Sequence, residues 1–288
     1  CFCPHEAWDP PEELVKMFDP KGYDCATGSS AGPYDKYAKH MDDDGLRNTQ
    51  ARYAAQVVLT DRWLGKLLDK MDEHNLWDNT VLIFTSDHGT FNGDHARLGK
   101  MQTHLHDATG HIPFIVAHPQ FGHGERRDQL VQLVDIYPTV LAAVNRPCPP
   151  DRHGVNLLPV LEDANAPTRD WAISGIFGKS VSITDGEWIL HQSPKDNNSP
   201  LYWYDYCWNR FMPGIELGEY ENGRRSAKTL SWPTETWLSH KKDDFNELVN
   251  LAESEPEKLR EMQQMLKQKL IEVGAPEEQL ERLDLEDA

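Results

Sequence analysis

The sequence predicts an α/β fold, and three observations carry that prediction. A run of β-branched and aromatic residues from Thr80 to Thr85 is typical of a strand buried on both faces, as in a parallel sheet. A helix is expected over about 49–74, and a short loop joins it to this strand, which together make half of a right-handed crossover. After about residue 165 short strands precede a single helix, which predicts a small antiparallel sheet with one covering helix.

The helix over 49–74 is predicted from an apolar stripe at three- and four-residue spacing. Its members are Tyr53, Val57, Leu64, Leu67, Leu68 and Met71. Residues 20–48 are rich in Gly, Pro, Ser and Asp and are expected to form a long surface excursion. A second buried strand is expected over 113–117.

In the second half, Asp135 is expected to cap a helix with Pro138 in its first turn that runs to about Val144. Strands are expected at 180–184 and 188–190, joined by a primed turn at Asp185-Gly186. Further strand is expected over 201–208 and 228–232. The last helix is predicted to begin with a capping box of Ser254 and Glu257 and to end at Gly274. Its apolar face consists of Leu259, Met262, Leu266 and Leu270.

The composition disfavours several classes of partner. Lys and Arg number 29 against 47 Asp and Glu, so the net charge of −18 argues against nucleic acid and anionic membrane surfaces. No apolar run is long enough to span a bilayer. The five cysteines are scattered, which argues against a disulfide framework. The chain starts without Met and shows no signal peptide, so we expect a fragment of a longer protein; compartment and oligomeric state stay open.

Candidate metal ligands follow the strand over 80–85. Ligands bind outside the carboxyl ends of strands in open α/β sheets, and this strand ends in Asp87, His88 and Gly89. Asp87 and His88 offer one oxygen and one nitrogen to a cation, and Gly89 permits a sharp turn. The alternative is a turn that merely ends a strand.

Other polar residues are weaker candidates. His5 lies on a loop before Pro10-Pro11 and is a candidate acid or base, with a solvated surface histidine as the alternative. Lys100 lies in a glycine-punctuated loop that could fold back over Asp87, where it would bind an oxyanion; otherwise it is a surface lysine. The nearby histidines lack the helical spacing of zinc ligands, so zinc ligation is disfavoured for His104, His106 and His111.

Several phrases together resemble the sulfatase family, in order and at family-like spacing. They are Pro4-His5-Glu6-Ala7-Trp8-Asp9-Pro10-Pro11, Asp61-Arg62-Trp63-Leu64-Gly65, Leu76-Trp77-Asp78-Asn79-Thr80, Thr85-Ser86-Asp87-His88-Gly89, Gly99-Lys100, His111-Ile112-Pro113, Val134-Asp135-Ile136-Tyr137-Pro138-Thr139 and Gly154-Val155-Asn156-Leu157-Leu158-Pro159. The resemblance implies the alkaline-phosphatase-like fold, with a mixed, largely parallel sheet flanked by helices and a small C-terminal antiparallel sheet plus helix. We therefore expect residues 1–165 to belong to the catalytic α/β domain and 166–288 to form a small α+β subdomain.

The resemblance also implies roles for four residues. Asp87 and His88 resemble the second pair of ligands to a divalent cation, usually calcium, with manganese or magnesium as alternatives. Lys100 resembles the lysine that holds a sulfate oxygen. His5 resembles the histidine that contacts the sulfate ester and can protonate the leaving oxygen. Ala7 replaces a commoner proline and His111 a commoner arginine, so substrate contacts differ there.

The activity implied is hydrolysis of a sulfuric ester by a formylglycine nucleophile, with a small-molecule or saccharide sulfate ester as substrate. The nucleophile is expected upstream of this chain, which alone should be inactive and poorly stable. Cys148-Pro149-Pro150-Asp151-Arg152 loosely matches the formylglycine motif but lies in a proline-rich connector, so no nucleophile is assigned. The alternatives are a phosphonate monoester or phosphodiester hydrolase of the same superfamily and a non-catalytic binding module.

Overall fold

The computed structural model describes residues 4–5, 8–22, 43–100, 104–121, 124–204, 215–229 and 232–286. The chain divides into two compact units, Cys1–Lys100 with His111–His123 and Met101–Gly110 with Gly124–Ala288. This division by compactness does not test the predicted domain boundary near residue 165, which stays a prediction.

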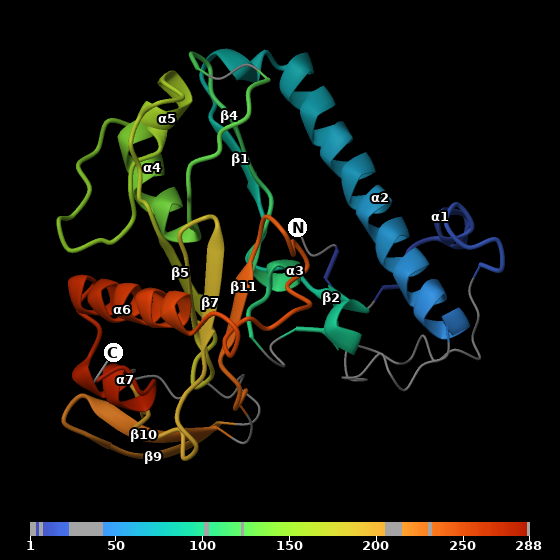
Figure 1. The fold of residues 1–288 in the computed structure, drawn as a ribbon. Coiled ribbons are helices and arrows are strands. Elements are labelled where there is room, and N and C mark those ends of the chain that lie inside the picture. The colour runs from blue at the N-terminus through green and yellow to red at the C-terminus, as the bar shows by residue number, and fades with distance from the viewer. Residues whose placement is uncertain are drawn as a thin grey trace. The chain divides into compact units, whose positions relative to one another are not determined.

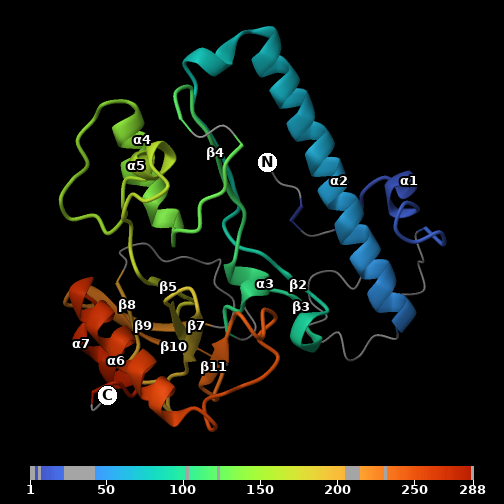
Figure 2. The same cartoon turned by 45° about the horizontal axis from the view of Figure 1, so that its top comes forward.

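The first unit contains a long helix and, among its described residues, two sheets of two strands each (Figure 1). Its elements are α1 (Glu12–Val15), α2 (Asp43–Glu73), the 3₁₀ turn η3 (Leu76–Asp78), β1 (Leu82–Thr85), β2 (Phe91–Asn92), the 3₁₀ turn η4 (Asp94–Ala96), β3 (Leu98–Gly99) and β4 (Phe114–Ala117). Both views show α1 beside the N-terminal half of α2 (Figures 1 and 2). Leu14 and Val15 of α1 are buried there against Ala51 and Ala55.

The sheet around β1 differs from the prediction. β1 pairs with β4 in the antiparallel sense, with Ile83 opposite Val116, and its four residues are half-buried rather than buried on both faces. Among the residues that the structure describes, all strand pairings are antiparallel, so the largely parallel sheet is not seen. The physical reason for the partial burial is that β1 has one described partner strand.

The predicted helix is present as α2 but begins earlier, at Asp43. Its buried face was predicted only in part. Met71 is buried as expected, whereas Val57 and Leu67 are exposed. Two of the buried residues in its first half, Ala51 and Ala55, pack against α1.

The second unit contains two antiparallel sheets and their helices. Its elements are α3 (Asp107–Gly110), the 3₁₀ turn η5 (Leu133–Asp135), α4 (Ile136–Ala143), α5 (Leu158–Glu162), β5 (Ala172–Gly175), β6 (Val181–Thr184), β7 (Trp188–Gln192), β8 (Tyr202–Trp203), β9 (Ile215–Glu221), β10 (Arg224–Thr229), β11 (Trp237–His240), α6 (Pro256–Glu272) and α7 (Glu277–Arg282). The sheets have the orders β11-β7-β6-β5 and β8-β10-β9. Helix α6 packs on β6 and β7, which confirms the predicted antiparallel sheet with a covering helix.

The core of this unit lies between α6 and the four-stranded sheet. Met262, Leu266 and Leu270 of α6 are buried against Ile183 of β6 and Leu190 of β7, as the apolar face predicted. Burying side chains of this size stabilises a fold by about 1.5–3 kcal/mol each. The predicted apolar face of α6 is therefore the face that packs into the core of the second unit.

The predicted turn and helix end are confirmed. The hairpin between β6 and β7 has Thr184 opposite Ile189, and Gly186 has φ +93°. Asp185 Oδ1 accepts the N–H groups of Glu187 and Trp188, which shapes the turn. Gly274, with φ +68°, follows α6, and the next N–H donates back to the Leu270 carbonyl.

Two predicted caps are wrong. Ser254 Oγ donates to the Leu251 carbonyl, and α6 begins at Pro256 with no side-chain cap, because proline already dispenses with one N–H. Asp135 does not cap α4 with its side chain. Its buried carboxylate accepts two hydrogen bonds of 2.5 Å from Arg169 and others from the N–H groups of Gln132 and Val155.

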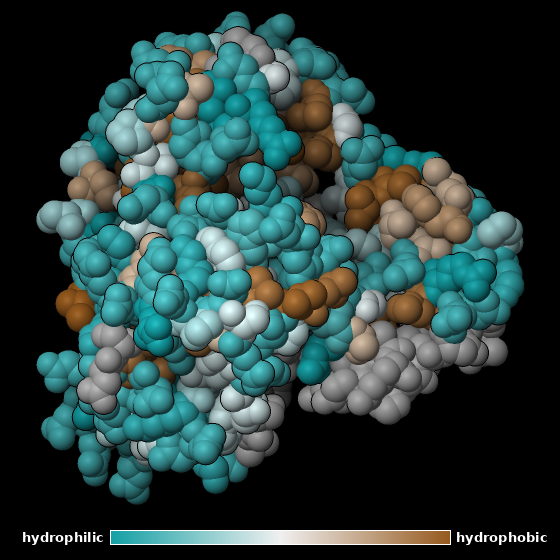
Figure 3. Space-filling model, in the orientation of Figure 1, coloured by the Kyte–Doolittle hydropathy of each residue, from teal (hydrophilic) through white to brown (hydrophobic). Residues whose placement is uncertain are grey.

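The surface in view is mostly hydrophilic, with hydrophobic residues in smaller patches (Figure 3). This agrees with the charge of −18. No helix among the described residues is both long and apolar enough to cross a membrane.

Candidate active site

The turn after β1 presents Asp87 and His88, as the sequence predicted. The backbone bends at Asp87, and two hydrogen bonds that involve side chains lie at the bend: Ser86 Oγ donates to the His88 carbonyl at 2.7 Å, and His88 N–H donates to Asp87 Oδ1 at 2.9 Å. The second carboxylate oxygen of Asp87 is left to point outward, and its side chain is 83% exposed.

The His88 ring is oriented by its own backbone neighbour. Its Nδ1 lies 2.9 Å from the Gly89 carbonyl, which only accepts, so Nδ1 carries the proton. The other nitrogen, Nε2, lies 3.6 Å from Asp87 Oδ2 and has a lone pair for a metal ion when the ring is neutral. A metal-bound histidine is characteristically fixed in this way, with its second nitrogen donating to a carbonyl.

The charge on Asp87 is favoured by its surroundings. Partial burial raises the pKa of this carboxyl group, but the neighbouring His88, hydrogen bonds from backbone N–H groups and the charge of Lys100 lower it by more. The pKa of Asp87 is therefore below its ordinary value.

The structure brings His5 and Lys100 together across 95 residues of sequence. Lys100 Nζ lies 2.8 Å from His5 Nε2, so the ammonium donates and the ring nitrogen accepts. Lys100 follows β3, which pairs with β2, the strand after the Asp87 bend. The four predicted residues thus belong to one compact unit.

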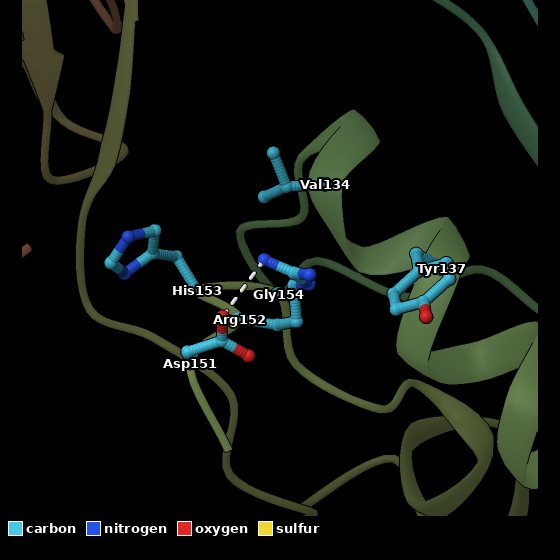
Figure 4. Close-up of a pocket in the computed structure, with 6 residues that line it drawn as sticks. All are labelled: Val134, Tyr137, Asp151, Arg152, His153 and Gly154. Carbon is cyan, nitrogen blue, oxygen red and sulfur yellow. Dashed lines mark hydrogen bonds and ion pairs between the residues drawn. The ribbon is translucent and has the colours of Figure 1, made fainter. Parts of the chain in front are cut away.

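The formylglycine-like segment belongs to the second unit. Cys148 is a free thiol in the irregular stretch after α4. The loop that follows lines a hollow of about 500 Å³ with Val134, Tyr137, Asp151, Arg152, His153 and Gly154, in which Arg152 pairs with Asp151 (Figure 4). Cys148 is not among these lining residues.

A second group of ligand-type side chains lies in the second unit, where the sequence argument disfavoured one. The ligand atoms of His106, His191 and Glu247 all lie within 4.8 Å of one another, and all three residues are buried. His106 Nδ1 is 2.9 Å and His191 Nε2 is 2.5 Å from Glu247 Oε2. The sequence offers no local spacing that could reveal this cluster, because its members come from three distant segments.

The cluster is charged at its centre. Burial raises the pKa of Glu247, but the hydrogen bonds from His106 and His191 lower it by more, so this pKa lies far below its ordinary value. Burial lowers the pKa of His191 despite the carboxylate beside it. His104, whose Nδ1 lies 3.0 Å from Ser180 Oγ, stacks on His191, and burial with the two neighbouring rings lowers its pKa to about 2.

The chain is similar in sequence to known sulfatases. It is 26% identical over 238 residues to Arylsulfatase K of Xenopus laevis, which covers 81% of this chain and 40% of that protein. The chain spans less than half the length of the Arylsulfatase K sequences it matches in frog, dog and rat.

Two solved structures show the same fold. One is a protein in complex with its substrate D-glucosamine-2-N,6-O-disulfate, with a TM-score of 0.59, 20% identity and coverage of 80% of this chain and 42% of the other. The other is a phosphonate monoester hydrolase from Silicibacter pomeroyi, with a TM-score of 0.62, 18% identity and coverage of 92% and 49%. The sulfatase family model matches residues 4–145, the segment that contains His5, Asp87, His88 and Lys100. Residues 4–145 therefore belong to the sulfatase family.

Proposed function

We propose that this chain is part of a sulfuric ester hydrolase in which Asp87 and His88 hold a divalent cation and Lys100 and His5 bind the sulfate group. One observation carries the proposal. Within the segment that matches the sulfatase family, Lys100 lies 2.8 Å from His5 and acts electrostatically on Asp87. The carboxylate of Asp87, the imidazole of His5 and the ammonium of Lys100 thus belong to one unit, although His5 and Lys100 are 95 positions apart.

The donor set fits a divalent cation. Asp87 Oδ2 and His88 Nε2 are 3.6 Å apart, too far for a hydrogen bond but suitable for two ligands of one ion. Calcium is the expected ion because the family resemblance implies it, with manganese or magnesium as alternatives. When bound, the cation would stabilise the negative charge that develops on the sulfate oxygens.

Lys100 would supply a second positive charge to the same oxygens. Its ammonium is a compact point charge with three donors, so it can bind a sulfate oxygen. This local charge matters because the whole chain carries a net charge of −18 and would otherwise repel an anionic substrate.

His5 would act on the leaving group. In the structure its Nε2 accepts a hydrogen bond from Lys100. Once Lys100 turns toward a sulfate oxygen, Nε2 is available to bind a proton and to deliver it to the ester oxygen as the S–O bond breaks. We propose that the attacking group is a formylglycine hydrate outside the residues assigned here.

The substrate class follows from the relatives. A structural neighbour was solved with a sulfated glucosamine as its substrate, and the curated relatives are arylsulfatases. We propose a saccharide or small-molecule sulfate ester as the substrate of the whole protein.

The direct test compares the full-length protein on an aryl sulfate, a phosphodiester and a phosphonate monoester. We expect the sulfate to be hydrolysed fastest. Replacing Lys100 by Ala should lower kcat/KM for the sulfate by about 10²–10³-fold, since one charge-stabilising donor is lost. Lys66, which lies on α2 over Trp63, is the matched control, and K66A should retain the activity.

Metal content supplies the second readout. Asp87→Asn should lower both the bound divalent metal and the rate, whereas Asp94→Asn, at an exposed acid of the same unit, should change neither. Unchanged metal content in D87N would remove Asp87 from the ligand set. Faster turnover of the phosphonate ester would favour the hydrolase of that class, and no turnover of any ester would favour a binding module.

A further inference from the structure

We propose that His106, His191 and Glu247 form a structural zinc site in the second unit, separate from the cation site proposed at Asp87 and His88. The three ligand atoms converge: both ring nitrogens lie within 2.9 Å of one carboxylate oxygen, Glu247 Oε2. Two imidazole nitrogens and one carboxylate are ligands that zinc takes in proteins. The three residues come from the segment before α3, from β7 and from the loop after β11.

Burial separates this cluster from the many surface groups of histidines and acids. The side chains of His191 and Glu247 are 0% exposed and that of His106 is 3% exposed. A buried carboxylate is expected to be paired with a cation or to coordinate a metal, because its ionised form is poorly solvated in the interior. The groups that reach Glu247 Oε2 are the imidazole rings of His106 and His191.

The residues around the ligands are arranged to support metal binding. Glu247 Oε1 accepts the N–H of Asp107 at 2.8 Å, which fixes the carboxylate and leaves Oε2 for the ion. His191 Nδ1 lies 2.6 Å from Ser182 Oγ. Zinc on His191 Nε2 requires the proton of the ring to be on Nδ1, and Ser182 Oγ can then accept it in a hydrogen bond. Without zinc the proton can be on Nε2, and the same hydroxyl then donates to Nδ1.

Zinc is preferred over calcium because two of the three ligands are nitrogens. Calcium and magnesium take oxygen ligands almost entirely. Three protein ligands leave the fourth position of a tetrahedral ion for a water molecule. The neighbouring His104 is not counted as a ligand, because its Nδ1 is held by Ser180 Oγ in a hydrogen bond of 3.0 Å. The ion would join three chain segments that the fold already brings together, so its role would be in stability.

The test measures zinc in the full-length protein carrying Asp87→Asn, so that the proposed active-site cation does not contribute. Protein produced with zinc and then desalted should retain about one zinc per chain, as a closed structural site does. Glu247→Gln and His106→Gln should each abolish this zinc. Ser182→Ala keeps all three ligands and should weaken zinc binding by about 10–100-fold.

The matched control is His240→Gln. His240 also lies between two carboxylates, with Nδ1 2.7 Å from Asp243 and Nε2 3.1 Å from Glu187, but both acids are exposed. H240Q should therefore leave the zinc content unchanged. Circular dichroism and thermal unfolding establish that each variant is folded.

Two results would overturn the proposal. The first is a folded E247Q or H106Q variant that keeps its zinc. The second needs no ligand variant: a folded D87N protein that neither retains zinc nor gains thermal stability when zinc is present during folding. Cobalt substitution gives an independent readout, because a tetrahedral site with nitrogen ligands should give intense visible absorption that S182A weakens and H240Q does not.

Discussion

The two groups of acid and imidazole in this protein differ in how they are built. Asp87 and His88 are adjacent in sequence, and the Asp87 side chain is 83% exposed. His106, His191 and Glu247 are brought together from three segments, and Glu247 is 0% exposed. Similar side chains thus occupy opposite environments.

The difference teaches what each environment demands. At the exposed turn, water solvates Asp87, so the carboxylate needs few protein partners and Oδ2 can remain open to a ligand. In the interior, Glu247 needs its charge satisfied by the protein, and both of its oxygens receive hydrogen bonds. We therefore expect the first group to matter for binding and the second for stability.

The largest expected effect is on the free energy of unfolding, and it tests the difference between the two groups directly. Glu247→Ala, measured with a chelator present, should lower the free energy of unfolding by about 3–5 kcal/mol, because buried donors on His106, His191 and Asp107 lose their acceptor. Asp87→Ala should change it by less than about 0.5 kcal/mol, because the side chain is exposed. Urea denaturation followed by tryptophan fluorescence measures both. Equal stabilities of the two variants would contradict the distinction.

A smaller effect on stability tests whether the second unit is also closely packed at a site away from His106, His191 and Glu247. A Cβ on Gly154 would lie 2.1 Å from the Val134 carbonyl oxygen, so Gly154→Ala should destabilise the protein by about 1–3 kcal/mol. The matched control lies in the first unit. A Cβ on Gly65 in α2 would have nothing within 4 Å, and Gly65→Ala should stabilise by about 0.5–1 kcal/mol.

Thermal unfolding of the two alanine variants gives the readout. Melting temperatures that move in the same direction would show that packing around Gly154 can relax, contrary to the backbone contact seen in the structure.

The smallest effect concerns pH and sharpens the contrast between exposed and buried histidines. Hydrogen bonds from His240 to Glu187 and Asp243 raise the pKa of His240 above 6.5. The charged ring therefore contributes stability that is fully present below about pH 6.5 and is lost as the pH rises through the raised pKa. His240→Gln should flatten the stability profile in that range. A profile identical to that of the unmodified protein would show that these exposed pairs contribute nothing measurable.

Local patterns predicted several elements of the fold, and the roles of the candidate site residues stay predictions. The hairpin at Gly186 and the end of α6 at Gly274 were predicted from the sequence because glycine is the residue that adopts a positive φ most readily. The hairpin of β9 and β10 was missed, although Asn222 and Gly223 both have positive φ and an Asn-Gly pair is a strong turn signal. Part of the strand expected over 201–208 and of that over 228–232 lies outside the described residues.

Errors arose where a side chain had a distant partner. Asp135 was predicted to cap α4, but Arg169, which lies 34 residues away, binds its carboxylate. The helix over 49–74 was expected to bury one regular apolar stripe, whereas the face of α2 that is buried depends on where α1 packs. Periodicity within one segment contains no information about either partner.

The sequence alone determined three features: the family resemblance, the turn that presents Asp87 and His88, and the apolar face of α6. Each depends only on residues that are neighbours in the chain or that recur at helical spacing. The tertiary structure alone decided that Lys100 reaches His5, that Arg169 pairs with Asp135, and that His106, His191 and Glu247 meet in the interior. The physical reason is that contacts between distant residues depend on how whole elements pack, and the free energy of that packing is summed over many side chains.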